Sequence, residues 1–206
     1  MDREDFLSSI LAVIAATASP TPKPVPSPSP TLAPWDQCIE STALSYDRPI
    51  DITMQTLDGP EFHLLKYRGQ AVLLNIFATW CPPCNDEQPF IVDAADRYSA
   101  QGLAIVGIND QDPDDHVRAY RKTYGITYPI AMDRHGGFTR ALEVGSQRDA
   151  NAYLPSTLFI TPQGFLYCFL MGPVSHDELD YRVKKFLVEA PPTLMPSPSP
   201  SPTGSL

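Results

Sequence analysis

The stretch Trp80-Cys81-Pro82-Pro83-Cys84 decides how this chain folds. It follows an apolar run at residues 71–78 that is typical of a buried strand, and helical spacing begins directly after it. The two cysteines therefore lie where a strand turns into a helix. Free N–H groups and the positive end of the helix dipole meet in a first helical turn, so we expect a thiolate on Cys81 to be stabilised there. Cys84 lies one turn further on, close enough to form a disulfide with Cys81.

A Cys-x-x-Cys pair can also be half of a zinc site or a purely structural disulfide. A structural zinc site usually needs four ligands, but the other two cysteines, Cys38 and Cys168, are isolated in the sequence. The four histidines are scattered without ligand spacing, and we expect them at the surface. The strand before the pair and the helix after it favour a redox pair over both alternatives.

Residues 72–89, VLLNIFATWCPPCNDEQP, resemble the active-site stretch of TlpA/ResA-type thioredoxin-like proteins, which are thiol–disulfide oxidoreductases with a redoxin-like AhpC/TSA domain. The resemblance spans residues 49–188, and its W-C-x-P-C-x-x-E-x-P motif is far more specific than Cys-x-x-Cys alone. It implies a thioredoxin fold and a redox disulfide between Cys81 and Cys84. It implies no metal or organic cofactor.

The same resemblance gives Glu87 a role. Glu87 lies three residues after Cys84, on the same side of the predicted helix, and TlpA/ResA-type proteins have a glutamate there. Many cytoplasmic thioredoxins instead carry a buried aspartate where this chain has Asn75. A partly buried carboxylate near the pair would have a raised pKa and could accept the proton of Cys84. The alternative is a solvated carboxylate near the start of the helix.

Pro155 is the remaining candidate catalytic residue. The resemblance implies a cis proline that faces the redox pair, with the backbone of Leu154 open to an extended substrate. The sequence alone would favour an ordinary trans proline at the start of a strand. Trp80, Pro82 and Pro83 would shape the surface on which the substrate lies.

The predicted elements follow the thioredoxin-fold order, which gives an α/β/α domain of three layers with a mixed sheet. We expect a hairpin turn at Asp58-Gly59, strands at 71–78, 103–108, 156–160 and 165–170, and a helix from Pro82 to Ala100. Asp112 should cap a second helix, with Pro113 at its first position. Ser175 and Glu178 form a capping box for the last helix. A short strand at 128–132 and a short helix at 138–144 complete the prediction.

The two ends of the chain differ from its middle. Residues 6–16 are apolar but too short for a comfortable membrane span, so residues 1–18 are predicted to be a signal peptide or anchor, although their acidic start is atypical. The alternative is a buried helix. Residues 19–34 should be an extended Pro/Ser-rich linker, residues 35–190 the thioredoxin-like domain, and residues 191–206 a Pro/Ser-rich disordered tail.

Charge and cysteine usage restrict the function further. A net charge of −9 leaves no basic footprint for nucleic acid. Cys168 lies in an apolar strand, so the default is a buried inert thiol; in an oxidising compartment it could instead form a second, structural disulfide with Cys38. We expect an extracytoplasmic protein, secreted or membrane-anchored in a bacterial cell envelope, and a monomer.

The predicted function is reduction of disulfides in exported proteins, with apocytochrome c as the most specific substrate and a membrane-bound thiol reductant as the electron donor, both by family analogy. Three alternatives remain open at this point. The protein could donate disulfides instead, it could be a peroxidase of the peroxiredoxin type, or it could be a non-enzymatic binding module with a structural Cys81–Cys84 bridge.

Overall fold

The computed structural model describes Cys38 and residues 48–142 and 154–192. The predicted signal peptide or anchor, the linker after it and all but the first two residues of the predicted tail lie outside these residues. None of the helices that the structure describes is long and apolar enough to cross a bilayer.

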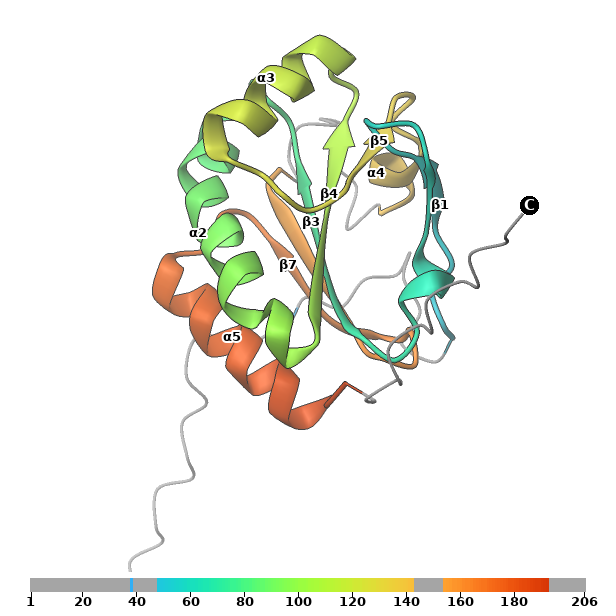
Figure 1. The fold of residues 1–206 in the computed structure, drawn as a ribbon, viewed down its shortest axis with the longest axis vertical. Helices are drawn as coiled ribbons and strands as arrows, with labels where there is room; N and C mark the ends of the chain where they lie inside the picture. The colour runs from blue at the N-terminus through green and yellow to red at the C-terminus, as the bar shows by residue number, and fades with distance from the viewer. Residues whose placement is uncertain (1–37, 39–47, 143–153, 193–206) are drawn as a thin grey trace, which may run out of the picture. The chain divides into compact units, whose positions relative to one another are not determined.

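A mixed sheet of five strands forms the centre of the domain, in the order β5-β4-β3-β6-β7 (Figure 1). Strands β3, β4 and β5 run parallel, and β6 and β7 are antiparallel to their neighbours. Their bounds are Ala71–Phe77, Leu103–Asp110, Ile130–Asp133, Ser156–Ile160 and Leu166–Met171. Every residue of β3 is buried, as expected of a central strand covered on both faces.

Helices cover one face of this sheet, and a hairpin with a short helix covers the other. Helices α2 (Pro82–Tyr98), α3 (Asp114–Tyr124) and α5 (His176–Glu189) lie on the first face in Figure 1. The other face carries the hairpin of β1 (Thr53–Gln55) and β2 (Glu61–His63), the 3₁₀ turn η2 (Leu64–Tyr67) and α4 (Gly137–Ala141). Each face buries its own hydrophobic cluster against the sheet. The predicted three-layer thioredoxin fold is confirmed.

The ends of several elements differ from the prediction. Helix α2 ends at Tyr98 and continues as the 3₁₀ turn η3 (Ser99–Gln101), which Gly102 terminates with a φ of 88° that favours glycine. Strand β5 begins at Ile130 and α4 at Gly137, each shifted by one or two residues from the prediction. Ser175 caps α5, as predicted, through its hydroxyl and the N–H of Glu178. The Glu178 carboxylate binds Arg182.

The prediction that Asp112 caps the second helix is wrong. The residue before α3 is Pro113, and no side chain caps that helix. The Asp112 carboxylate instead accepts hydrogen bonds from the backbone N–H of Thr79 at 2.6 Å and from the side chain of Asn109 at 2.7 Å. Local sequence favoured a cap, but a tertiary partner in the loop after β3 binds this carboxylate.

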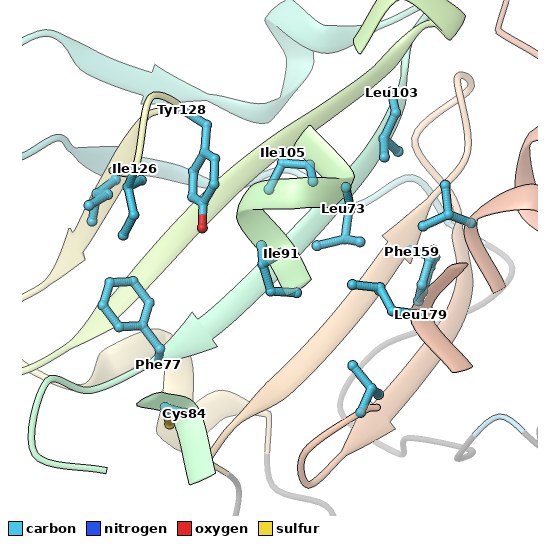
Figure 2. Packing of buried hydrophobic residues seen from close by; sticks show 14 of the residues in the cluster. Leu73, Phe77, Cys84, Ile91, Leu103, Ile105, Ile126, Tyr128, Phe159 and Leu179 are labelled. Atoms are coloured by element: carbon cyan, nitrogen blue, oxygen red, sulfur yellow. The ribbon is translucent and has the colours of Figure 1, made fainter. Parts of the chain in front are cut away.

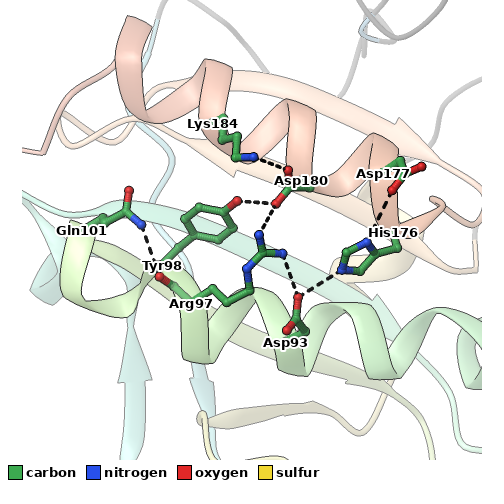
Figure 3. A network of polar contacts seen from close by, with 8 residues as sticks. All are labelled: Asp93, Arg97, Tyr98, Gln101, His176, Asp177, Asp180 and Lys184. Atoms are coloured by element: carbon green, nitrogen blue, oxygen red, sulfur yellow. Dashed lines mark hydrogen bonds and ion pairs between the residues drawn. The ribbon is translucent and has the colours of Figure 1, made fainter.

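A polar network fastens α5 to α2, the helix that begins with the redox pair (Figure 3). Asp93 on α2 lies 3.0 Å from Arg97 and 3.1 Å from His176 of α5. Arg97 reaches Asp180 on α5 at 2.9 Å, and Tyr98 donates to the same carboxylate. These contacts are half-exposed, so each adds little stability by itself. Together they fix how α5 lies along α2, beside the buried apolar contact of the two helices.

Candidate active site

Cys81 occupies the N-cap position of α2, and its sulfur accepts a hydrogen bond from the N–H of Cys84 at 3.3 Å. Pro82 and Pro83 fill the next two positions and have no N–H, so the Cys84 N–H is the first donor that the helix offers. That donor and the helix dipole both point at the Cys81 sulfur, where they would stabilise a thiolate. Cys81 and Cys84 are joined by a disulfide, with their Cα atoms 5.3 Å apart.

The pair lies at the end of the apolar core that α2 covers. Figure 2 shows Cys84 beside Phe77, at one end of the cluster that continues through Ile91 and Leu73. Cys81 and Cys84 are 3% and 2% exposed, whereas Trp80 is 52% exposed. Trp80 therefore exposes a large apolar surface directly beside the buried disulfide.

Pro155 lies at the same edge of the sheet as the pair. Strand β6 runs antiparallel to β3 with Ser156 opposite Ile76, so Pro155 lies beyond that last pair, where the chain leaves β3 towards Trp80. The Leu154–Pro155 peptide bond is cis, the isomer that the family resemblance implies. Pro155 is buried and Leu154 is half-buried.

Glu87 is the most unusual group near the pair. It lies one turn beyond Cys84 on α2 and is 2% exposed. Its carboxylate accepts hydrogen bonds from the side chain of Asn75 at 2.7 Å and from the N–H of Val174 at 2.8 Å. Burial raises the pKa of Glu87 to about 7 despite these two bonds, and the charge of Glu178 adds to the rise. Such a group can both take and release a proton near neutral pH.

Asn75 orients this carboxylate. Its side-chain amide lies between Glu87 and the hydroxyl of Thr157 on β6, at 2.7 Å and 3.5 Å. An aspartate at this position would place two carboxylates within hydrogen-bond distance and hinder the ionisation of both. Asparagine supplies a donor without a second charge.

Sequence reasoning missed the residues that support the pair from the side. Tyr120 of α3 donates to the carbonyl of Cys84 at 3.4 Å and stacks on Phe77. Gln88, buried next to Glu87, donates to the hydroxyl of Tyr128. Asp112 binds the N–H of Thr79, one residue before Trp80. These contacts come from α3 and the segments around β5, and no local pattern in the sequence predicts them.

Cys38 and Cys168 lie elsewhere. They are joined by a second disulfide with an S–S distance of 1.98 Å, across a sequence separation of 130 residues. Cys168 is on β7, the edge strand of the sheet. Among the described residues, His, Cys, Asp and Glu form no cluster able to hold a metal ion. His116, His135 and His176 are exposed, and His63 is half-buried.

A sequence profile of the AhpC/TSA family matches residues 47–168, which include the redox pair, Glu87 and Pro155. The chain belongs to the AhpC/TSA family. Within this family it is similar to the thiol-disulfide oxidoreductase ResA of Geobacillus thermodenitrificans, with 31% identity over 129 residues, 63% of this chain and 70% of that protein. ResA of Bacillus subtilis is 27% identical over 69% of this chain and 75% of its own length.

Solved structures share the fold of this chain. A thioredoxin-family thiol:disulfide interchange protein from Chlorobium tepidum is 31% identical, with a TM-score of 0.58, over 67% of this chain and 96% of its own. A secreted disulfide oxidoreductase of Mycobacterium tuberculosis shares the fold at 24% identity and a TM-score of 0.56, over 65% of this chain and 95% of its own. This AhpC/TSA family member is thus a thiol–disulfide oxidoreductase of the ResA type with a Cys-x-x-Cys pair.

Proposed function

We propose that this oxidoreductase reduces disulfides in exported proteins, with Cys81 as nucleophile and Cys84 as resolving thiol. The observation that carries the proposal is the pairing of an N-cap sulfur with a buried carboxyl one turn further along the same helix. The first favours a thiolate on Cys81, and the second can take the proton of Cys84.

The reaction proceeds in two exchanges. The Cys81 thiolate attacks one sulfur of the substrate disulfide, forms a mixed disulfide and releases the other substrate sulfur as a thiolate. Cys84 loses its proton to Glu87 and attacks the Cys81 sulfur. The Cys81–Cys84 disulfide closes, and the second substrate thiolate leaves. Two electrons pass from the pair to the substrate, and a thiol reductant must return them, for which we propose a membrane-bound donor.

Trp80, Pro82, Pro83 and Leu154 are the residues that we propose to contact the substrate. Trp80 is exposed beside the pair, and Pro82 is exposed at the first position of α2. Leu154 precedes the cis bond at the start of β6, where its backbone can pair with an extended peptide. Pro155, which is buried, would fix the direction of the backbone at Leu154. A protein disulfide in an extended segment fits such a surface, and the family analogy makes apocytochrome c the most specific substrate that we propose.

We also propose an extracytoplasmic location, secreted or membrane-anchored. A disulfide between residues 130 positions apart, outside the redox pair, persists in an oxidising compartment and is rare in the cytosol. The apolar segment at residues 6–16 and the Pro/Ser-rich linker at 19–34 supply a means of export or attachment.

The test is the reduction potential of Cys81–Cys84, measured by equilibration with defined dithiol buffers, alkylation and peptide mapping. A value near roughly −270 mV, as in thioredoxin, is expected of a reductant. A value near roughly −120 mV would mark a disulfide donor and overturn the proposed direction. An oxidised peptide carrying a Cys-x-x-Cys-His haem site, compared with one whose cysteines are spaced differently, tests the substrate. Equal rates for the two peptides would remove apocytochrome c as the preferred substrate.

A further inference from the structure

The two sulfurs of the second disulfide lie in different surroundings. Cys38 is exposed. Cys168, on β7, is 2% exposed and belongs to the apolar cluster under α2 and α5. The residue on one side of this bond is thus open to solvent, whereas the residue on the other side is not, so we expect a thiol in solution to attack at Cys38.

A buried cation lies against the inaccessible sulfur. Arg182 of α5 is 8% exposed, and its Nη1 lies 3.7 Å from the Cys168 sulfur. Its Nε and Nη2 both lie 2.9 Å from Oε1 of Glu178, one turn earlier on α5. Glu178 thus binds the Nε and Nη2 groups of Arg182, and the Nη1 group faces the Cys168 sulfur.

A neutral disulfide sulfur gains little from a guanidinium, whereas a thiolate gains a charge-assisted hydrogen bond in a site screened from water. Low-dielectric surroundings make an unpaired thiolate costly, and the adjacent Arg182 guanidinium lowers that cost at Cys168. A sulfur that departs as a stabilised thiolate is the faster leaving group in thiol–disulfide exchange. Arg182 therefore favours cleavage that leaves the charge on Cys168.

We propose that Cys38–Cys168 is a second exchangeable disulfide, which external thiols open by attack on Cys38 while Cys168 leaves as a thiolate held by Arg182. The site requires an external dithiol as reductant. Its thiolate forms a bond to the Cys38 sulfur, the Cys38–Cys168 bond breaks, and the electron pair goes to Cys168. The second thiol of the reductant loses its proton, attacks its own partner sulfur and releases the Cys38 thiolate. The reductant ends as a disulfide, and two electrons have passed to the protein.

This proposal is independent of the one made for Cys81 and Cys84. The test uses the full chain with Cys81→Ala and Cys84→Ala, beside the unmodified protein. The oxidised protein is mixed with excess 2-mercaptoethanol without denaturant, quenched in acid at short intervals and alkylated. Peptides produced by pepsin at low pH then show which cysteine carries mercaptoethanol and which carries the alkyl group.

We expect the native protein to react, with mercaptoethanol on Cys38 and the alkyl group on Cys168 in at least tenfold excess over the reverse. A bond that opens only when denaturant unfolds the chain would overturn the proposal. Equal amounts of the two products, or an excess on Cys168, would overturn it as well. This readout needs no change at Arg182, and the unmodified protein provides it beside the Cys81→Ala, Cys84→Ala variant.

Substitutions on α5 then test whether Arg182 speeds the opening of Cys38–Cys168. Arg182→Met should slow opening roughly three- to tenfold, and Arg182→Lys should restore much of the rate. Glu178→Gln should accelerate opening, because it removes a carboxylate charge that Arg182 binds. Lys184→Met is the matched control, since Lys184 lies on the same helix, is exposed and pairs with Asp180. Equal rates in folded Arg182→Met, Glu178→Gln and Lys184→Met would show that Arg182 has no part in the exchange.

Discussion

The two disulfides of this protein differ in the charged side chain that each one meets. Near Cys81–Cys84 the buried ionisable group is an acid, Glu87, whose pKa is raised to about 7 by burial. Against Cys168 it is the guanidinium cation of Arg182. An acid near a thiol can remove its proton, whereas a cation can only hold the thiolate once it forms. The first site is therefore suited to rapid turnover, and the second to holding one open or closed state.

The largest expected effect separates the roles of the two pairs. Cys81→Ser should lower reduction of a protein disulfide by roughly 10⁴-fold or more, because it removes the nucleophile. Cys84→Ser should still attack but should accumulate the mixed disulfide on Cys81, since nothing resolves it. Turnover is followed by thiol release, and the trapped adduct by mass. Full activity of Cys81→Ser would assign turnover to Cys38–Cys168 instead of Cys81–Cys84.

The two disulfides should rank in the opposite order by their contribution to stability, with Cys38–Cys168 ahead of Cys81–Cys84. In the chain-entropy description, closing a loop of 130 residues stabilises by about 5 kcal/mol, whereas a loop of four residues contributes about 2 kcal/mol. Cys38→Ala should therefore lower the free energy of unfolding more than Cys84→Ala, by about 3 kcal/mol. Urea unfolding of both variants under oxidising conditions measures the difference. An equal loss in the two variants would contradict this ranking.

The pH dependence of stability tests the titration of Glu87. Burial raises the pKa of Glu87 from 4.5 to about 7, so between these values the folded state keeps a proton that the unfolded state releases. The free energy of unfolding should fall as pH rises through this window, by about 3 kcal/mol in all. The decline should be absent in Glu87→Gln. Urea unfolding of both proteins at pH 4 to 8 gives the difference. If the free energy of unfolding varied with pH in the same way in both proteins, Glu87 would not titrate in this range.

The smallest of these effects concerns the resolving step. Glu87→Gln should slow closure of the Cys81–Cys84 disulfide roughly 100-fold at neutral pH, because Cys84 loses its proton acceptor. In the unmodified protein the same step should slow as pH falls below about 7, where Glu87 becomes protonated. Stopped-flow measurement of the decay of a preformed mixed disulfide reports this step. A pH profile unchanged by the substitution would assign the proton to another group.

The sequence predicted the fold well because its signals are local. The apolar run of β3, the helix start at Cys81 and the glycine turn before β7 each depend on neighbouring residues. The position of Glu87 also followed from helical spacing. Asp112 was misassigned because its partner, Thr79, is 33 residues away in sequence. Arg182 was missed for the same reason, since only the packing of α5 on β7 brings it to Cys168.

The bond between Cys38 and Cys168 also determines which parts of the molecule bear mechanical load. Tension between the chain before Cys38 and the carboxyl-terminal end passes through the two sulfurs directly into β7. The covalent ring that this bond closes contains β3, α2 and the redox pair, and all of them lie outside the direct path of the force. A protein held by its amino-terminal end could therefore be pulled while its catalytic turn stays at rest. Once the bond opens, the same pull reaches the domain through residue 48 and the strands that follow.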